Sequence, residues 1–322
     1  MPPAIVRRLI SVPAVLLVAT FLWSTMLLWL PLLWLVDKMA GKSYWRATFF
    51  LTWFTLMDSI GILALLLSWL SLPLVGKSGL ERQTLAIQRF WAAGVWSGAV
   101  IAFRASIRVT GEDSILPMPA VILPRHTSLA DTMLAQLVIQ KPYKTLLRYV
   151  LKQELLWEPC LDIAGNRLPN VFVKRNSGNV ERELEQISQG VADLGRDEGI
   201  LLYPEGTRFN PKLSQSIKSK MAGQIDPNGP IASLEHVLPA KPAGLFTILD
   251  AVPDLDVVFM AHVGFDSFRN LSDLTNGTAL DTVCKVHCWR VAARDIPAEL
   301  DARSEWLAKE WKKMDEMVVE LS

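Results

Sequence analysis

The chain contains a histidine and an aspartate that are spaced to act as a general base pair. His126 precedes Asp131 in the run Arg-His-Thr-Ser-Leu-Ala-Asp. A histidine that removes a proton from a hydroxyl needs an acceptor on its other ring nitrogen, which fixes the tautomer and stabilises the imidazolium. Asp131 is the candidate acceptor. The two positions would diverge by about 140° on a straight α-helix, so we expect His126 in a turn that precedes a helix.

The surrounding sequence predicts that turn. Residues 120–124 read as a short buried strand that ends at proline. Thr127 or Ser128 can then cap a helix that runs to about Gln140. This arrangement would place His126 at the carboxyl end of a strand, where open α/β sheets hold their ligands.

A second polar turn follows another short apolar segment, residues 199–203. The turn, residues 204–208, reads Pro-Glu-Gly-Thr-Arg. Gly206 allows a sharp turn or a close backbone approach, and the planar Arg208 guanidinium suits two phosphate oxygens. Glu205 beside an arginine can also be a simple ion pair, but that reading does not explain two polar turns at two strand ends. Together the turns suggest acyl transfer to an alcohol that bears a phosphate.

These residues resemble the motifs of the glycerophospholipid acyltransferases, which make phosphatidate and remodel lysophospholipids. The matching positions are His126, Ser128 and Asp131, then Val171–Arg175, then Pro204–Arg208. The resemblance covers roughly residues 108–315 and extends to the branch that contains the longer lysophosphatidate and lysocardiolipin acyltransferases. Many members carry asparagine where this chain has Arg125, whose charge would meet the acceptor phosphate or face solvent.

The resemblance implies a reaction and a set of site residues. A fatty acyl group would move from acyl-CoA or acyl-carrier protein to the free hydroxyl of lysophosphatidate, with His126 and Asp131 as the catalytic pair and no cofactor beyond that co-substrate. Backbone N–H groups just after His126 would stabilise the oxyanion. The residues expected around the acceptor phosphate are Lys174, Arg175, Glu205, Gly206, Thr207, Arg208 and Lys241.

Three alternatives remain open at the level of sequence. The acceptor can be another lysolipid, such as lysophosphatidylglycerol, lysocardiolipin or lysophosphatidylinositol. The donor can be a phospholipid. The chain can also be a membrane lipid-binding protein without turnover. A lipid panel separates the first two alternatives from the favoured reaction, and binding without acyl transfer would identify the third.

The N-terminal third is apolar enough to enter a membrane. No charge occurs between Leu9 and Val36, and Asp58 is the one ionisable residue in 47–76. Either segment exceeds the roughly 20 residues that cross a bilayer. We therefore expect residues 1–103 to form a membrane anchor, with a hairpin of apolar helices at about 9–36 and 47–76 and an interfacial helix at about 90–103.

The position of the anchor in the membrane is less constrained. Prolines inside the apolar segments allow a hairpin that spans the bilayer or one that dips into a single leaflet. Asp58 would serve a function within the membrane or, as we favour, lie at the interface. Flanking positive charges place the catalytic domain on the cytoplasmic side of a bacterial inner membrane or an endoplasmic reticulum membrane.

Composition is consistent with one catalytic domain, residues 104–322. Its predicted order of strands and helices favours an α/β fold with a mostly parallel central sheet flanked by helices. The predicted strands are residues 107–109, 120–123, 145–150, 171–173, 199–203, 257–263 and 282–291; the clearest helices are 180–194 and 297–321, and residues 210–230 read as a loop.

Charge and cysteine content exclude other classes of partner. The formal net charge is +1, which gives no support for nucleic-acid binding. Cys160, Cys284 and Cys288 are an odd number without a paired metal-binding spacing. We expect them to be reduced and buried, and we expect no metal site.

Overall fold

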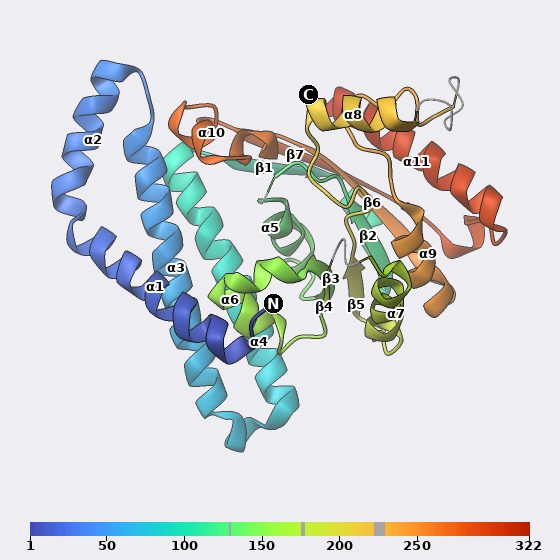
Figure 1. The fold of residues 1–322 in the computed structure, drawn as a ribbon, viewed down its shortest axis with the longest axis horizontal. Coiled ribbons are helices and arrows are strands. Elements are labelled where there is room, and N and C mark those ends of the chain that lie inside the picture. The colour runs from blue at the N-terminus through green and yellow to red at the C-terminus, as the bar shows by residue number, and fades with distance from the viewer. Residues whose placement is uncertain (129, 175–177, 222–228) are drawn as a thin grey trace.

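The computed structural model describes residues 1–128, 130–174, 178–221 and 229–322. Four N-terminal helices lie beside an α/β unit (Figure 1). They are α1 (Ala4–Ser24), α2 (Met26–Ala40), α3 (Tyr44–Leu70) and α4 (Leu72–Phe103).

The α/β unit is built on a seven-stranded sheet within the described residues. The strands are β1 (Ser106–Thr110), β2 (Ala120–Pro124), β3 (Leu146–Lys152), β4 (Val171–Val173), β5 (Glu198–Leu201), β6 (Asp256–Val263) and β7 (Val283–Val291). Their order is β1-β7-β6-β2-β5-β3-β4. Neighbouring strands are parallel except for β6 and β7. The mostly parallel sheet predicted from the sequence is therefore confirmed.

Helices cover both faces of this sheet (Figure 1). They are α5 (Asp131–Ala135), α6 (Pro159–Gly165), α7 (Val180–Val191), α8 (Pro211–Met221), α9 (Pro242–Ala251), α10 (Leu271–Thr275) and α11 (Leu300–Leu321). The shorter segments are η1 (Glu112–Ser114), η2 (Gln136–Gln140), η3 (Gln153–Trp157), η4 (Phe265–Phe268) and η5 (Ala293–Asp295). Alternate β2 residues serve two cores: Val121 packs with α7, α9 and α11, whereas Ile122 packs with α5 and η2, as expected for a strand buried on both faces.

The central position of β2 decides where the site forms. β2 lies between β5 and β6, with Ile122 opposite Leu201 and Leu123 opposite Phe259. Because these strands are parallel, their carboxyl ends meet at one edge of the sheet. The turns after Pro124 and Leu201 therefore lie side by side.

The N-terminal helices differ from the predicted hairpin in their boundaries. The predicted helix at 9–36 is divided near Thr25 into α1 and α2, and the predicted interfacial helix at 90–103 is the end of α4. Within α4 the backbone turns at Gly76, whose φ is 67°, a conformation that glycine adopts without steric cost. Among the described residues, α1, α3 and α4 are long and apolar enough to cross a membrane.

Contacts with the α/β unit extend along α3. The backbone N–H of Ser43, which precedes the helix, donates to Thr275 O at 2.8 Å. Near the other end, Arg167 Nη1 donates to Leu65 O at 2.9 Å. Asp58 is buried and accepts a hydrogen bond from Trp91 Nε1 at 2.7 Å. Asp58 thus packs between helices of the protein, which differs from the interfacial position that we favoured.

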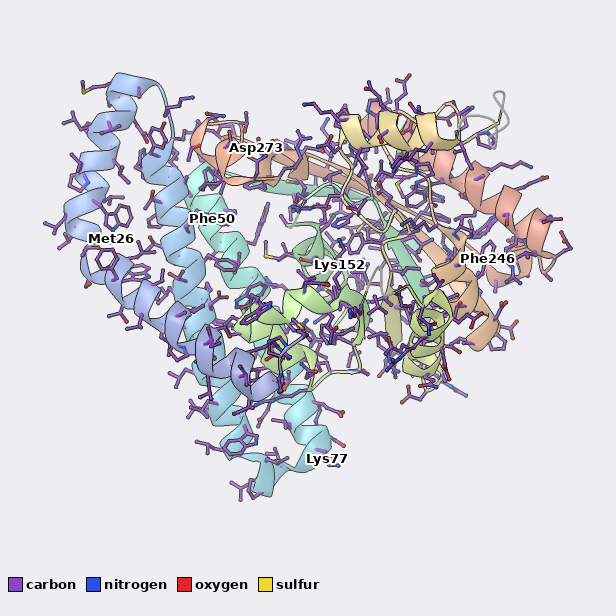
Figure 2. All side chains as sticks on the ribbon, viewed as in Figure 1. Met26, Phe50, Lys77, Lys152, Phe246 and Asp273 are labelled. Atoms are coloured by element: carbon purple, nitrogen blue, oxygen red, sulfur yellow. The ribbon has the colours of Figure 1, made fainter. Side chains whose placement is uncertain are left out.

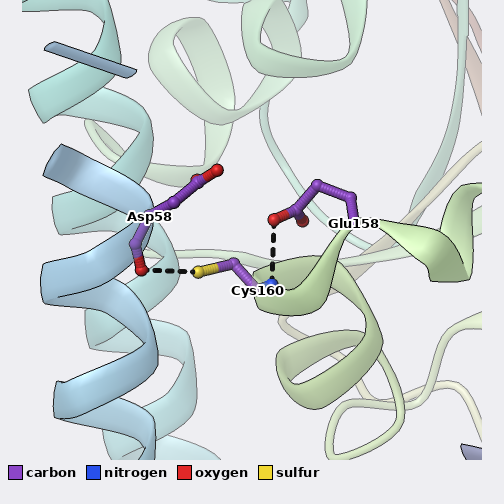
Figure 3. Close-up of side chains that lie close together, drawn as sticks. All are labelled: Asp58, Glu158 and Cys160. Atoms are coloured by element: carbon purple, nitrogen blue, oxygen red, sulfur yellow. Dashed lines mark hydrogen bonds between the residues drawn. The ribbon is translucent and has the colours of Figure 1, made fainter. Parts of the chain in front are cut away.

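A polar clamp joins the middle of α3 to α6 (Figure 3). The Cys160 thiol donates to Asp58 O at 3.3 Å, and Cys160 N donates to Glu158 Oε1 at 2.9 Å. Burial raises the pKa of the Cys160 thiol far above its usual range, so the thiol keeps its proton. The ligand atoms of these three side chains lie within 4.8 Å of one another, and the two hydrogen bonds link α3 to the start of α6.

The start of α1 is also tied to α6. Asp162, which is fully buried, accepts from Arg7 Nη2 at 2.6 Å and from Arg8 Nε at 2.9 Å. Arg7 Nε also donates to Leu156 O at 3.3 Å. The basic residues at the N-terminus therefore neutralise a buried charge in the α/β unit.

Two local predictions were wrong. Part of the expected loop at 210–230 is helix α8, while residues 222–228 lie outside the described part of the chain. The helix after His126 ends at Gln140 as predicted, but it begins at Asp131 and continues as a π-helix from Gln136. The cap position is Ala130, because the hydroxyl-bearing residues before it interact with Asp131. All three cysteines are free and buried, as expected.

Candidate active site

His126 and Asp131 form a hydrogen-bonded pair. His126 Nδ1 lies 3.1 Å from Asp131 Oδ2. The same carboxylate oxygen accepts the backbone N–H groups of Thr127 at 2.5 Å and Ser128 at 2.8 Å. Burial alone would raise the pKa of Asp131, but His262, His126 and the Ser128 hydrogen bond outweigh it and lower that pKa. The carboxylate is therefore charged, and its contact with Nδ1 leaves Nε2 as the ring nitrogen of His126 that can accept a proton.

The backbone of His126 joins the two sequence motifs. Its N–H donates to Glu205 Oε1 at 2.7 Å, and its carbonyl accepts from Phe209 N at 2.6 Å. Glu205 Oε2 accepts from Leu238 N at 2.8 Å. Burial raises the pKa of Glu205 to about 8, against the opposing effects of these N–H groups and of Arg125. Glu205 is not among the residues that line the cavity described below, so it holds the two turns together, which differs from the expected role at the phosphate.

Arg125 is structural, contrary to both sequence-based expectations. Its side chain is 3% exposed. Nη1 donates to His262 O at 2.9 Å and to Asp266 at 3.2 Å, and Nε donates to His236 O at 3.1 Å. The guanidinium therefore faces neither solvent nor a substrate phosphate, because it donates hydrogen bonds to two backbone carbonyl groups and to the Asp266 carboxylate.

His262 is a second histidine beside the pair, and its role was not recognised from the sequence. It lies in the predicted strand 257–263, at the sheet edge that carries the site, and this position was the available signal. His262 Nε2 lies 2.9 Å from Arg125 O and 3.9 Å from Asp131 Oδ1. Burial and, to a lesser extent, Arg125 lower the pKa of His262, although Asp131 and Asp266 oppose this.

This environment predicts a pH-dependent stability. Because the pKa of folded His262 is lowered, the unfolded histidine takes up its proton first, below a pH of about 6.5. The unfolded state then binds more protons, so the free energy of unfolding falls as pH decreases below about 6.5, and the His262 contribution is complete above it. His262→Gln retains a donor for Arg125 O without titrating. Thermal unfolding at a series of pH values should show wild type losing stability relative to H262Q between about pH 7 and 5; parallel curves would contradict this.

A cavity of about 510 Å³ opens between α3, α4 and the sheet edge. Figure 2 labels Phe50 and Lys152, which line it from the helical side and the sheet side. Its apolar walls include Phe50, Phe54, Trp91, Val95, Trp96, Ala99, Leu151, Leu155 and Phe268. Its polar lining includes His126, Gln136, Tyr149, Lys152, Glu158, Tyr203 and Arg208. The cavity therefore combines space for an apolar chain with a base and two cations.

Two of the predicted phosphate residues meet at the second turn. Gly206 has a φ of 73°, and a Cβ there would approach Lys241 Nζ to 3.2 Å, so glycine leaves room for that lysine. Lys241 N also donates to Pro204 O at 2.9 Å. Arg208 lines the cavity, whereas Thr207 lies between them in the turn and is half-buried.

The two cations predicted after the fourth strand, Lys174 and Arg175, are not among the described residues that line the cavity. Lys174 is exposed and is not among the cavity-lining residues. Arg175 lies outside the described residues. Lys152, at the end of β3, was missed because the predicted strand stopped at Val150. A lysine directly after a predicted strand was the signal that sequence reasoning could have used.

Several of the expected oxyanion donors are already engaged. The N–H of His126 donates to Glu205, those of Thr127 and Ser128 donate to Asp131, and that of Ala130 donates to Ser128 Oγ. Leu129 lies outside the described residues. Within the described part of this turn, these backbone N–H groups thus hold the Asp131 carboxylate and join the turn to Glu205.

Comparison with known proteins adds evidence on family and fold. Residues 106–261 match the family model described as Acyltransferase. The 1-acyl-sn-glycerol-3-phosphate acyltransferase epsilon of Mus musculus is 24% identical over 215 residues. This match covers 62% of the chain and 57% of the mouse protein, so the chain spans less than two thirds of that relative.

A solved structure shares the fold. The crystal structure of the 1-acyl-sn-glycerophosphate (LPA) acyltransferase PlsC from Thermotoga maritima superposes with a TM-score of 0.56, over 85% of this chain and 97% of that chain. The sequence identity is 14%. At this identity the similarity supports the arrangement of helices and sheet.

Proposed function

We propose that this protein transfers a fatty acyl group from an acyl thioester to the free hydroxyl of lysophosphatidate, which gives phosphatidate. The match of residues 106–261 to the acyltransferase family model supports this proposal. The observation that carries the proposal is the shared cavity of His126, Lys152 and Arg208. A base beside two cations and apolar walls suits an alcohol that carries both a phosphate and an acyl chain.

In the proposed mechanism His126 Nε2 removes the proton of the acceptor hydroxyl as the oxygen attacks the thioester carbonyl. Asp131 stabilises the imidazolium through the hydrogen bond to Nδ1. The proton then passes to the departing thiolate, so no covalent acyl-enzyme is required. Arg208 and Lys152 would hold the acceptor phosphate by charge-assisted hydrogen bonds, with Lys241 as a further cation at the second turn.

The apolar helices suit a site that receives lipids. Exposed apolar side chains on the N-terminal helices include Leu27, Leu28, Leu63, Trp69 and Leu74. We propose that these helices attach the enzyme to a membrane and that the catalytic unit faces the cytoplasm, where acyl-CoA and acyl-carrier protein occur. Cysteine-scanning accessibility in sealed vesicles would test this orientation.

The reaction is tested with purified enzyme, lysophosphatidate and radiolabelled oleoyl-CoA, with the lipid products separated by chromatography. Phosphatidate from wild type supports the proposal. Product only with other lysolipids, or only with acyl-carrier protein or a phospholipid as donor, would change the acceptor or donor and retain the chemistry. Lipid binding without any acyl transfer would reject the enzymatic function.

Removing the cavity cations should affect the acceptor more than the donor. Arg208→Gln and Lys152→Gln are each expected to raise KM for lysophosphatidate about tenfold or more, because a charge-assisted hydrogen bond contributes about 1.5–3 kcal/mol. Steady-state kinetics at saturating acyl-CoA measures this change. Lys309→Gln, which removes the same charge from an exposed position on α11, is the control. Equal effects on all three variants would contradict a specific phosphate site.

A further inference from the structure

We propose that Asp315, on helix α11, is a positioning residue for the catalytic pair, because it fixes the segment that holds Glu205 and Arg125 beside His126. This segment, residues 235–238, is called the bridging segment below. Asp315 is not among the cavity-lining residues, so it acts through the protein and not on the substrate. The inference rests on the proposed acyl transfer and adds to it a residue from the opposite end of the chain.

Asp315 holds the bridging segment by its backbone. The carboxylate accepts the N–H groups of Glu235 at 3.1 Å, His236 at 2.6 Å and Val237 at 3.0 Å. Consecutive N–H groups that converge in this way form a nest for a negative charge. The bridging segment belongs to no helix or strand, so its N–H groups need partners from outside regular structure. Asp315, which is 7% exposed, supplies them.

Helix α11 makes a second contact with the bridging segment one turn earlier. Trp311 Nε1 donates to Leu238 O at 2.8 Å. Trp311 and Asp315 are at positions i and i+4 and therefore lie on the same face of the helix. Trp311 and Leu307 belong to the buried core on one side of the sheet. The helix is thus a fixed platform from which the bridging segment takes its position.

The bridging segment also contacts the catalytic turn. Leu238 N donates to Glu205 Oε2 at 2.8 Å, and Glu205 Oε1 accepts from His126 N at 2.7 Å. Arg125 Nε donates to His236 O at 3.1 Å. Two hydrogen-bonded routes therefore run from α11 to adjacent residues of the catalytic turn. A displacement of the bridging segment would reach the base through both routes.

Asp315→Asn tests this role. An amide keeps one acceptor oxygen, and its nitrogen would oppose the converging N–H groups of the bridging segment. We expect kcat to fall about 10–10²-fold, since a displacement of about 1 Å in an active site can cost 10²-fold in rate. KM for both substrates should change little, because the two routes include neither Lys152 nor Arg208. An unchanged kcat, or a loss that appears only in KM, would overturn the proposal.

The double variant D315N/H126A separates positioning from a general loss of stability. Once the base is absent, its position no longer matters, so the double variant should be about as slow as H126A alone. Rates are measured well below the thermal midpoints of all variants. If the fold loss of kcat in the double variant equalled the product of the two single losses, Asp315 would act independently of His126 and the proposal would be wrong.

Glu310→Gln is the matched control. Glu310 lies on the same helix, is half-buried, and accepts a hydrogen bond from Trp289 Nε1 on β7 at 2.8 Å. The change removes the same charge and weakens a contact between α11 and the sheet. We expect a lower thermal midpoint with kcat within a few-fold of wild type. A kcat loss equal to that of D315N would overturn the proposal.

Hydrogen exchange makes the test independent of turnover. Mass spectrometry on the detergent-solubilised full chain should show exchange at least about tenfold faster in D315N than in wild type, in peptides that contain His126 and Leu238. E310Q should exchange there as wild type does. Trp311→Phe removes the donor to Leu238 O and keeps an aromatic ring; it should also speed this exchange, and it carries the test if D315N does not fold.

The outcomes separate this proposal from the proposed reaction. Unchanged exchange in the peptide that contains His126 would reject the role of Asp315 even if acyl transfer is confirmed. Faster exchange in the variants, with a wild type that transfers no acyl group, would support the positioning role and reject the proposed acceptor and donor.

Discussion

His126→Ala is expected to lower kcat for acyl transfer about 10²–10⁴-fold, the usual contribution of a general base. KM for both substrates should change little, since the cations that hold the acceptor are untouched. The backbone contacts of His126 with Glu205 and Phe209 do not require its side chain. The variant should therefore fold normally, which thermal unfolding and rate measurements on the same preparation would check.

His236→Ala provides the control for this change. The His236 carbonyl accepts a hydrogen bond from Arg125, and its backbone N–H donates one to Asp315. His236 is not among the cavity-lining residues. Its loss should leave kcat within a few-fold of wild type. Equal rates for wild type and H126A would reject the base mechanism.

Asp131→Asn should be as damaging to kcat and more damaging to the fold. An amide at this position favours the wrong histidine tautomer, which costs about 10⁴-fold in the serine protease precedent. The amide nitrogen would also oppose the N–H groups of Thr127 and Ser128, which now donate to the carboxylate. We expect a lower thermal midpoint in addition to the loss of kcat, measured beside H126A.

The double variant tests whether the two residues act as one unit. Once His126 is absent, Asp131 has no imidazolium to stabilise, so H126A/D131N should be about as slow as the slower single variant. If the fold loss of kcat in the double variant equalled the product of the two single losses, the residues would act independently. That result would contradict the pair while leaving the acyl transfer itself intact.

The parts of the site that the sequence predicted were those set by local chemistry. Proline after an apolar run ended β2, and the spacing of His126 and Asp131 required a turn between them. The glycine of the second turn likewise has a positive φ. Each of these features depends on residues only a few positions apart, so the chain itself contains the information.

The residues that were misjudged depend on distant partners. Arg125 precedes the first motif and Glu205 belongs to the second. Both are charged, so a contact with solvent or substrate was the simplest expectation. Their partners come from segments about 30 to 140 residues away, which no local pattern reveals. Lys152 was missed for the same reason, because its place in the same cavity as His126 follows from the order of strands in the sheet.

The buried ion pairs at the start of α1 limit how this protein can be shortened. Asp162 has no solvent access, forms ion pairs with Arg7 and Arg8, and accepts a further hydrogen bond from Asn166. A truncated form that begins at α2 or α3 would leave that carboxylate without its cations, and breaking a buried pair costs about 3–5 kcal/mol. This is a large part of the roughly 5–15 kcal/mol that holds a typical domain together. Efforts to obtain a water-soluble catalytic fragment should therefore keep the first helix and alter its outward apolar side chains.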